Sequence, residues 1–233
     1  MRPITFAHRG ARTELPENTV PAFERALALG AGGLESDAWL SADGEVVLVH
    51  DPVVRNGLRR LRVSRSAAAR LAEAGVPRLR DVYGSLGAAY ELSLDIKDPR
   101  AAEPVIELAR EVRAASRLWL CSPDVDLLGR LRDVAPDVRL VHSVRRRAVT
   151  GPIERHAFDL ARIGIDAMNM HHTDWTRGLV ALFHRFEVRA FAWDAQEVRH
   201  LEALLRMDVD ALYCDRPERM VAVVEAYRGA DGA

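Results

Sequence analysis

Lysine and cysteine are the scarce residues of this chain. Among its 33 basic residues only one is lysine, Lys97, and the others are arginine. The two cysteines, Cys121 and Cys214, are too few for a disulfide framework and lack the spacing of a metal-binding pair. We therefore expect two buried thiols in a protein of a reducing compartment, the cytoplasm.

An excess of charge and a long apolar run are missing as well. The 33 basic and 34 acidic residues give a net charge of −1, which argues against a nucleic-acid-binding protein and a polybasic membrane binder. The start of the chain, MRPITFAHRG, lacks the apolar segment of a signal peptide, and no run approaches the length of a membrane span. We expect no stable membrane insertion.

Short apolar runs alternate with amphipathic segments along the whole chain. Apolar residues at three- and four-residue spacing predict helices at residues 19–30, 101–115, 124–135, 153–164, 174–186 and 197–207. Strands are expected at residues 4–8, 33–40, 90–97, 117–122, 138–144, 167–172, 188–193 and 211–215. This alternation predicts an α/β fold, a (β/α)8 TIM-type barrel that residues 1–233 form as a single domain. A doubly wound open sheet is the alternative, disfavoured because no G-x-G-x-x-G turn or P-loop is present.

One segment leaves no room for a helix after the second strand. The stretch SADGEVVLVHD contains Asp43-Gly44, a strong signal for a two-residue β-hairpin turn. If these two residues form the turn, His50 lies opposite Asp37. The two-residue alternation of a strand also places Glu35 and Asp37 on the same face.

Three carboxylates fall at or near the ends of neighbouring predicted strands, where a barrel builds its active site. They are Glu35, Asp37 and Asp95. Carboxylates that converge on one barrel mouth repel each other, and a hard divalent cation relieves that repulsion. Their oxygen ligands favour one Mg²⁺ or Ca²⁺ over zinc.

Basic and titratable side chains share the same strand ends. Arg9 and Lys97 would suit an anionic group such as a phosphate, and His8 and His50 could supply a base and an acid for phosphoester cleavage. Each residue taken alone could be structural, half of an ion pair or a hydrogen-bonded core group. Together they favour an active site, because seven ionisable groups gathered in one place would destabilise the fold and need a functional reason to be there.

The remaining histidines are expected to be structural or exposed. His142, His171 and His172 lie near strand ends without an assigned partner. His156 and His184, like His200, fall in helical segments and are expected at the surface.

The runs HRGARTELPENTVPAFERALALG and GLESDAWLSADGEVVLVHD resemble the glycerophosphodiester phosphodiesterase family. The shared order is His-Arg-Gly, Pro-Glu-Asn-Thr, Glu-x-Asp, Asp-Gly and His-Asp within residues 8–51, with weaker likenesses in LSLDIK, FAWD and YCDRPE. The resemblance implies a TIM-type barrel and metal-dependent hydrolysis of glycerophosphodiesters to glycerol 3-phosphate and an alcohol. It implies that His8 and His50 form the acid–base pair, Glu35 and Asp37 ligate the metal, and Arg9 contacts phosphate.

The chain departs from the family pattern in two places. Asp95-Ile96-Lys97 stands where the family usually has Glu-x-Lys, whereas the sphingomyelinase D-type phospholipases, which are similar to this family, use Asp-x-Lys at this place. The segment after His50, DPVVRNGLRRLRVSRS, lacks the family's Thr-rich continuation and an inserted cap domain. Among weaker motifs, we interpret Trp193 as a substrate-pocket wall and Asp215 as a helix N-cap.

Three functions stay open at this point. The first is a phosphodiesterase acting on a small glycerophosphodiester. The second is a phospholipase D-type enzyme acting on lysophospholipids, and the third is a barrel that binds such molecules without catalysis. Competent residues at every expected position argue against the third. The head group, the metal and the oligomeric state cannot be read from the sequence.

Overall fold

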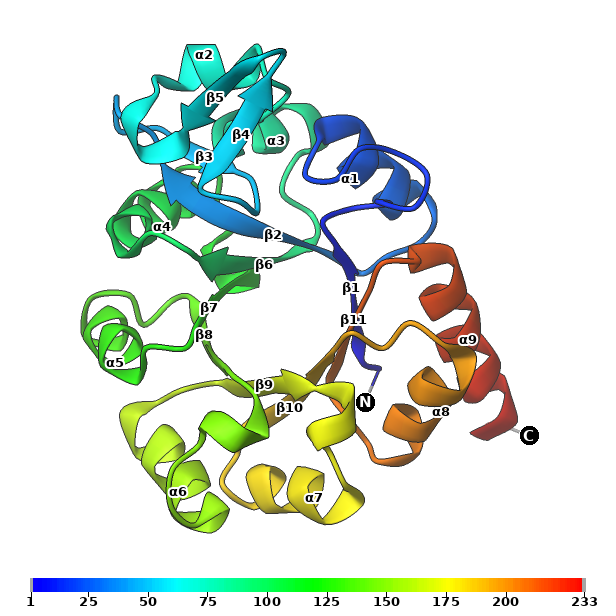
Figure 1. The fold of residues 1–233 in the computed structure, drawn as a ribbon. Coiled ribbons are helices and arrows are strands. Elements are labelled where there is room, and N and C mark those ends of the chain that lie inside the picture. The colour runs from blue at the N-terminus through cyan, green and yellow to red at the C-terminus, as the bar shows by residue number, and fades with distance from the viewer. Residues whose placement is uncertain (1, 232–233) are drawn as a thin grey trace.

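A closed barrel of parallel strands forms the centre of the computed structural model, which describes residues 2–231 (Figure 1). Its eight strands are β1 (Ile4–His8), β2 (Gly33–Leu40), β6 (Glu91–Ile96), β7 (Leu118–Ser122), β8 (Arg139–Ser143), β9 (Ala167–His171), β10 (Arg189–Trp193) and β11 (Ala211–Cys214). All eight match predicted strands. The assignment of residues 1–233 to one domain stays a prediction, and its ends, residues 1 and 232–233, lie outside the described residues.

The pairing of the first strand closes the barrel. Strand β1 pairs in parallel with β11 on one side and with β2 on the other, and the remaining strands follow in chain order between them. The predicted TIM-type barrel is therefore confirmed, and the open-sheet alternative is wrong.

Helices surround the barrel and cover its outer face (Figure 1). They are α1 (Val20–Ala28), α2 (Ala68–Ala72), α3 (Leu79–Leu86), α4 (Ala102–Glu111), α5 (Val125–Val134), α6 (Ile153–Ile163), α7 (Arg177–Arg185), α8 (Val198–Arg206) and α9 (Pro217–Asp231). Three of these helices, α1, α5 and α7, begin at a residue whose side chain accepts a backbone N–H of the first turn, namely Thr19, Asp124 and Thr176. The six predicted helices are all present, and α9 follows Asp215, where the N-cap interpretation expected a helix, whereas α2 and α3 were not anticipated.

Aromatic side chains fill the interior of the barrel. Phe6, Trp119, Phe191 and Tyr213 are at most 3% exposed and pack with smaller residues into one cluster. The rings of Phe6 and Tyr213 stack at 4.8 Å. Burial of this apolar surface stabilises the barrel and closes it beneath the mouth, so a ligand can enter only above this layer.

The chain departs from the barrel pattern after β2. Strand β3 (Val46–Leu48) returns antiparallel to β2, as expected, but Ala38 pairs with Leu48, one residue away from the predicted register. The turn is longer than two residues because the Ser41 hydroxyl binds Asp43 at 2.6 Å and accepts the Glu45 N–H at 2.9 Å. The predicted pairing of Asp37 with His50 is therefore wrong, and the backbone of Asp37 instead accepts the N–H of Val49.

A second hairpin follows, built by β4 (Val53–Asn56) and β5 (Arg59–Arg62).

Within the described residues, no helix is long and apolar enough to cross a membrane.

Candidate active site

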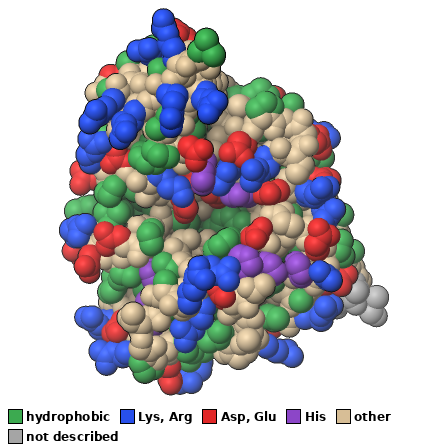
Figure 2. All heavy atoms as spheres, viewed as in Figure 1, with side chains coloured by type: hydrophobic (Ala, Val, Ile, Leu, Met, Phe, Trp, Pro, Cys, Tyr) green, Lys and Arg blue, Asp and Glu red, His purple; other side chains and the backbone are tan. Residues whose placement is uncertain are grey.

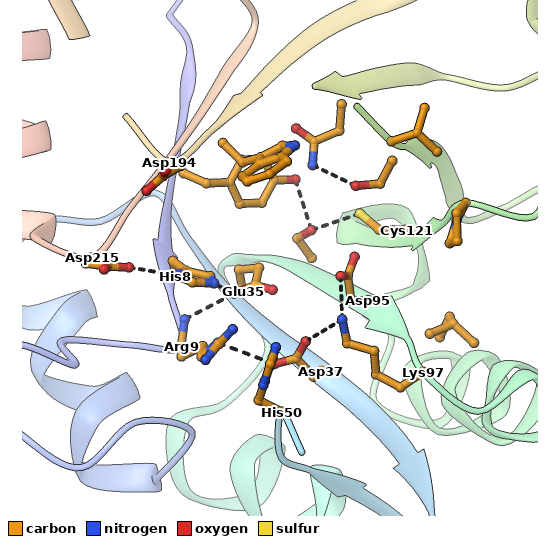
Figure 3. Close-up of a pocket in the computed structure, with 18 of the residues that line it drawn as sticks. His8, Arg9, Glu35, Asp37, His50, Asp95, Lys97, Cys121, Asp194 and Asp215 are labelled. Atoms are coloured by element: carbon orange, nitrogen blue, oxygen red, sulfur yellow. Dashed lines mark hydrogen bonds and ion pairs between the residues drawn. The ribbon is translucent and has the colours of Figure 1, made fainter. Parts of the chain in front are cut away.

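A pocket of about 660 Å³ opens at the carboxyl ends of the barrel strands. Charged and histidine side chains gather around the hollow at the centre of Figure 2. Figure 3 shows that they come from several strands and point toward one another. The pocket brings together all eight residues predicted for the site, namely His8, Arg9, Glu35, Asp37, His50, Asp95, Lys97 and Trp193.

Three carboxylates meet in this pocket because of strand register. Asp37 on β2 pairs directly with Asp95 on β6, and Glu35 lies two residues earlier on the same face of β2. One oxygen from each carboxylate lies within 4.8 Å of the others. Glu35 and Asp37 are only 6% and 2% exposed, so this negative charge is held largely out of solvent.

Lys97 compensates part of that charge. Its Nζ lies 3.1 Å from Oδ1 of Asp37 and 3.0 Å from Oδ2 of Asp95. Burial opposes the lysine charge, but Asp95 and Asp37 outweigh it and raise the pKa of Lys97. The chain's one lysine is therefore a fixed cation in the pocket.

Glu35 lacks a comparable partner. Burial raises its pKa to about 8, against the lowering effect of His8, and the negative charges of Asp37 and Asp95 add to the rise. Asp95 is affected in the same direction, since burial raises its pKa more than Lys97 lowers it. Burial is the main cause of both shifts, and the neighbouring carboxylates add to it.

These residues fit a hard divalent cation. Oδ2 of Asp37 is buried, accepts no hydrogen bond within residues 2–231, and lies 3.5 Å from Nε of Arg9. A buried oxygen without a hydrogen bond, next to two further carboxylates, belongs to the oxygen donor set that Mg²⁺ and Ca²⁺ prefer.

His8 is held from both sides of its ring. Its Nδ1 lies 2.6 Å from Oδ1 of Asp215, and its Nε2 lies 3.8 Å from Oε2 of Glu35. Burial alone would lower the pKa of His8, but Glu35 and Asp215 together raise it above its ordinary value. The Asp215 carboxyl, despite its burial, has a lowered pKa because it binds His8 and Arg12.

The sequence reading missed this role of Asp215, which it assigned to a helix N-cap. Its side chain binds His8 instead, across 207 residues of sequence. The available signal was position: Asp215 directly follows β11, the strand that pairs with β1.

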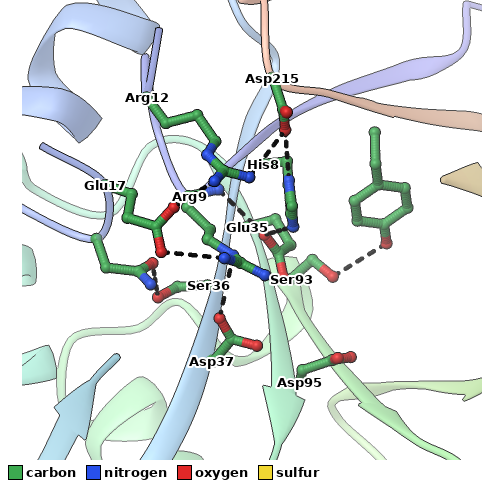
Figure 4. A network of polar contacts seen from close by, with 12 residues as sticks. His8, Arg9, Arg12, Glu17, Glu35, Ser36, Asp37, Ser93, Asp95 and Asp215 are labelled. Carbon is green, nitrogen blue, oxygen red and sulfur yellow. Dashed lines mark hydrogen bonds and ion pairs between the residues drawn. The ribbon is translucent and has the colours of Figure 1, made fainter. Parts of the chain in front are cut away.

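Arg9 adopts an unusual backbone conformation, with φ of 58°. Its N–H groups reach inward: the backbone N–H donates to Oε2 of Glu35 at 3.1 Å, and Nη1 donates to Oε1 of Glu17 at 3.0 Å (Figure 4). The Pro-Glu-Asn-Thr motif explains this placement, because Asn18 donates its backbone N–H to the Arg9 carbonyl and accepts the Ser36 hydroxyl. Left-handed backbone at a non-glycine residue is a conformation that active sites often hold.

His50 enters the pocket from the loop after β3 (Figure 3). Its Nδ1 lies 2.8 Å from Oδ1 of Asp51, so this exposed neighbour is its hydrogen-bond partner.

Trp193 lies on the pocket wall, as predicted. His171 packs edge-on against its ring at 4.7 Å, and the Arg145 guanidinium lies 5.6 Å from the ring centre. His171 in turn pairs with Asp194 at 3.0 Å. The Trp193 ring is therefore supported on two sides.

The two cysteines lie where the sequence predicts, whereas His156 does not. The cysteines are free and buried, as expected, and burial raises the pKa of Cys121 at the pocket floor. His156 is half-buried rather than on the surface, because its Nε2 lies 3.1 Å from Nδ1 of the buried His142.

Comparisons with known proteins point to one enzyme family. A model of the glycerophosphoryl diester phosphodiesterase family matches residues 8–219. A glycerophosphodiester phosphodiesterase of Caldanaerobacter subterraneus is 25% identical over 96% of this chain and 98% of its own. The crystal structure of a glycerophosphodiester phosphodiesterase from Thermotoga maritima has a TM-score of 0.82 at 22% identity, covering 96% of this chain and 99% of that one.

A further solved structure is similar in fold and contains a ligand. It is a phosphodiesterase of Oleispira antarctica in complex with the product sn-glycerol-3-phosphate, with a TM-score of 0.82 at 18% identity, covering 96% of this chain and 97% of that one. Since the family model spans nearly the whole sequence and begins at the pocket residue His8, this chain belongs to the glycerophosphoryl diester phosphodiesterase family.

Proposed function

We propose that this chain, a phosphodiesterase by family, hydrolyses glycerophosphodiesters to glycerol 3-phosphate and an alcohol with the help of one divalent cation. The observation that carries the proposal is the convergence of three carboxylates, two cations and two histidines on one pocket at the carboxyl ends of the barrel strands. A pocket with this chemistry suits a small anionic diester.

We assign the cation to Glu35, Asp37 and Asp95, with Mg²⁺ or Ca²⁺ as the expected ion. When bound, such a cation neutralises charge on the phosphoryl oxygens and favours ionisation of the attacking oxygen. Asp95 is one methylene shorter than the family's usual glutamate, but Lys97 holds it toward Asp37.

The other pocket residues bind the diester and move protons. Arg9 and Lys97 would contact the phosphate, and Trp193 would form a wall beside it. His8 and His50 reach the pocket from different elements, so they would act on opposite oxygens, one as base and one as acid. Asp215 would keep the His8 ring in one orientation through its bond to Nδ1.

The attacking nucleophile would come from the substrate. A glycerophosphodiester carries a free hydroxyl next to the phosphoester oxygen, and a held phosphate brings that hydroxyl within reach of phosphorus. One histidine takes the hydroxyl proton as the new O–P bond forms, and the other protonates the departing alcohol as the old O–P bond breaks. The product of this step is a five-membered cyclic phosphate, which water then opens to glycerol phosphate.

Two alternatives differ in how well they fit. A non-catalytic barrel is disfavoured because every expected position holds a competent side chain. A lysophospholipid substrate has the same reactive group and fits the same residues. A cytoplasmic location is proposed on the two free thiols.

The experiment that tests the proposal is an activity panel followed by phosphorus NMR. Glycerophosphocholine, glycerophosphoethanolamine and a lysophospholipid should each be tested with and without EDTA. We expect glycerol 3-phosphate from at least one small diester, loss of activity with EDTA, and much slower turnover of a 2-deoxy analogue. Absence of hydrolysis of every small diester would refute the function, whereas equal rates for the deoxy analogue would refute only the cyclic route.

A further inference from the structure

Positive charge is concentrated in the segment that follows His50. Residues 52–70 contain six arginines and no acidic residue. Without these six, the chain has 27 basic residues against 34 acidic ones, so the segment is a basic patch on an otherwise acidic protein. We name it the arginine hairpin; its arginines are Arg55, Arg59, Arg60, Arg62, Arg65 and Arg70.

In the part of the chain that the structure describes, the arginines of this hairpin lack carboxylate partners. All six are exposed, and none forms an ion pair within residues 2–231, whereas Arg25, Arg78 and Arg110 elsewhere each bind a carboxylate at 2.6–2.8 Å. Arg55 and Arg60 even face each other directly across β4 and β5. Like charges in that position destabilise a hairpin, and an external anionic surface would relieve the repulsion.

An apolar side chain stands at the tip of the same hairpin. Leu58 is 106% exposed, the highest value among the exposed large hydrophobic residues. The underside of the hairpin is fixed, because Leu61 is 4% exposed and packs in a small core with Val47 and Leu71. The exposed leucine and the arginines therefore belong to a hairpin that is held in place by its own small core.

The arginine hairpin lies beside the mouth of the pocket. Strand β4 begins three residues after His50, which lines the pocket. Figure 1 shows the β4–β5 hairpin at one side of the barrel, and Figure 2 shows basic side chains gathered along that edge, on the same face as the hollow.

We propose that the arginine hairpin docks this protein on a bilayer surface that carries anionic head groups. The arginines would lie on the head groups, and Leu58 would enter the boundary between head groups and acyl chains. Nucleic acid offers the same phosphate charge but no apolar layer for an exposed leucine at the tip, so the lipid surface is the better match. Docking in this orientation would bring the pocket mouth close to lysophospholipids in the bilayer. The use of these lipids as substrates rests on the proposed function, whereas the docking itself does not.

Binding to vesicles tests the docking without any catalysis. Phosphatidylcholine vesicles with and without phosphatidylglycerol should be sedimented with the protein at low and high salt. We expect binding only to the anionic vesicles, weakened by salt. The double variant Arg59→Ala/Arg60→Ala should bind about 25-fold more weakly, at about fivefold for each arginine. The control, Arg130→Ala/Arg199→Ala, removes two exposed arginines outside the hairpin and should bind like the wild type.

The variant Leu58→Asp separates a lipid surface from other polyanions. It should weaken vesicle binding more than it weakens binding to duplex DNA. Equal vesicle binding by the hairpin and control variants, no preference for anionic vesicles, or tighter binding to DNA than to vesicles would each overturn the proposal.

Activity links the docking to the substrate. The Arg59→Ala/Arg60→Ala variant should turn over soluble glycerophosphodiesters like the wild type but hydrolyse lysophosphatidylcholine in anionic vesicles more slowly. Failure of all proteins on soluble diesters would refute the proposed function and leave the vesicle-binding result standing.

Discussion

Single residues in the pocket show where charge is compensated and where it is not. Lys97 pairs with Asp37 and Asp95, while the only side-chain cation within 4 Å of the Glu35 carboxylate in residues 2–231 is His8, at 3.8 Å. Burial raises the pKa of Glu35 to about 8, and the charges of His8 and Arg9 do not offset it. The proposed cation would supply further positive charge beside Glu35.

The two pocket histidines should be needed for turnover. Replacing His8 or His50 by alanine removes a proton-transfer group and should lower kcat about 10²-fold or more. Steady-state kinetics on a soluble glycerophosphodiester measures this. His184→Ala is the control, since His184 pairs with Asp210 and lies outside the pocket lining. Near-normal turnover by the His8 or His50 variant would remove that residue from the mechanism.

Asp215 should control the pH dependence of the reaction. Its carboxylate stabilises the charged His8 ring and, with Glu35, raises the pKa of His8. The variant Asp215→Asn keeps the size of the side chain but removes its charge, so the pKa of His8 should fall. The limb of the pH–rate profile that reports His8 should then move to lower pH, whether His8 acts as acid or as base. An unmoved limb would show that Asp215 has only a structural role.

Among the elements, the junction of β1 and α1 holds Arg9 at the pocket. Arg9 takes its left-handed conformation there, and Gly10 follows with φ of 81°. A Cβ at Gly10 would lie 2.7 Å from the backbone carbon of Ala22, so the glycine permits both the turn and the close approach of α1. This contact explains the His-Arg-Gly motif in terms of packing as well as chemistry.

Replacing Gly10 by alanine should therefore destabilise the protein more than a similar change elsewhere. Gly44 is the matched control, with φ of 84° and no atom within 4 Å of a Cβ placed there. Gly44→Ala should cost about 1–2 kcal/mol of unfolding free energy from backbone strain alone. Gly10→Ala should cost about 1–3 kcal/mol more because of the added clash. Urea denaturation measures both, and equal losses would contradict a role for the close approach of α1.

For the whole molecule, barrel closure decides which parts of the site could be predicted from sequence. The eight strands and the residues at their ends followed from local periodicity, because each strand carries its own pattern. The contact of His8 with Asp215 could not be read locally, since it exists only because β1 pairs with β11. The register of β3 was missed by one residue because hydrogen bonds of the Ser41 side chain lengthen a turn that Asp43-Gly44 alone would make shorter.

The central claim is that one divalent cation, held by the three carboxylates, is required for hydrolysis of glycerophosphodiesters. Calorimetric titration of the chelated protein with Mg²⁺ or Ca²⁺, followed by the activity assay, tests it most directly. The account predicts one bound ion per chain, activity restored by that ion, and clearly weaker binding by Asp37→Asn than by the control Asp133→Asn at an exposed carboxylate. Full activity after exhaustive chelation, or equal affinity in the two variants, would contradict it.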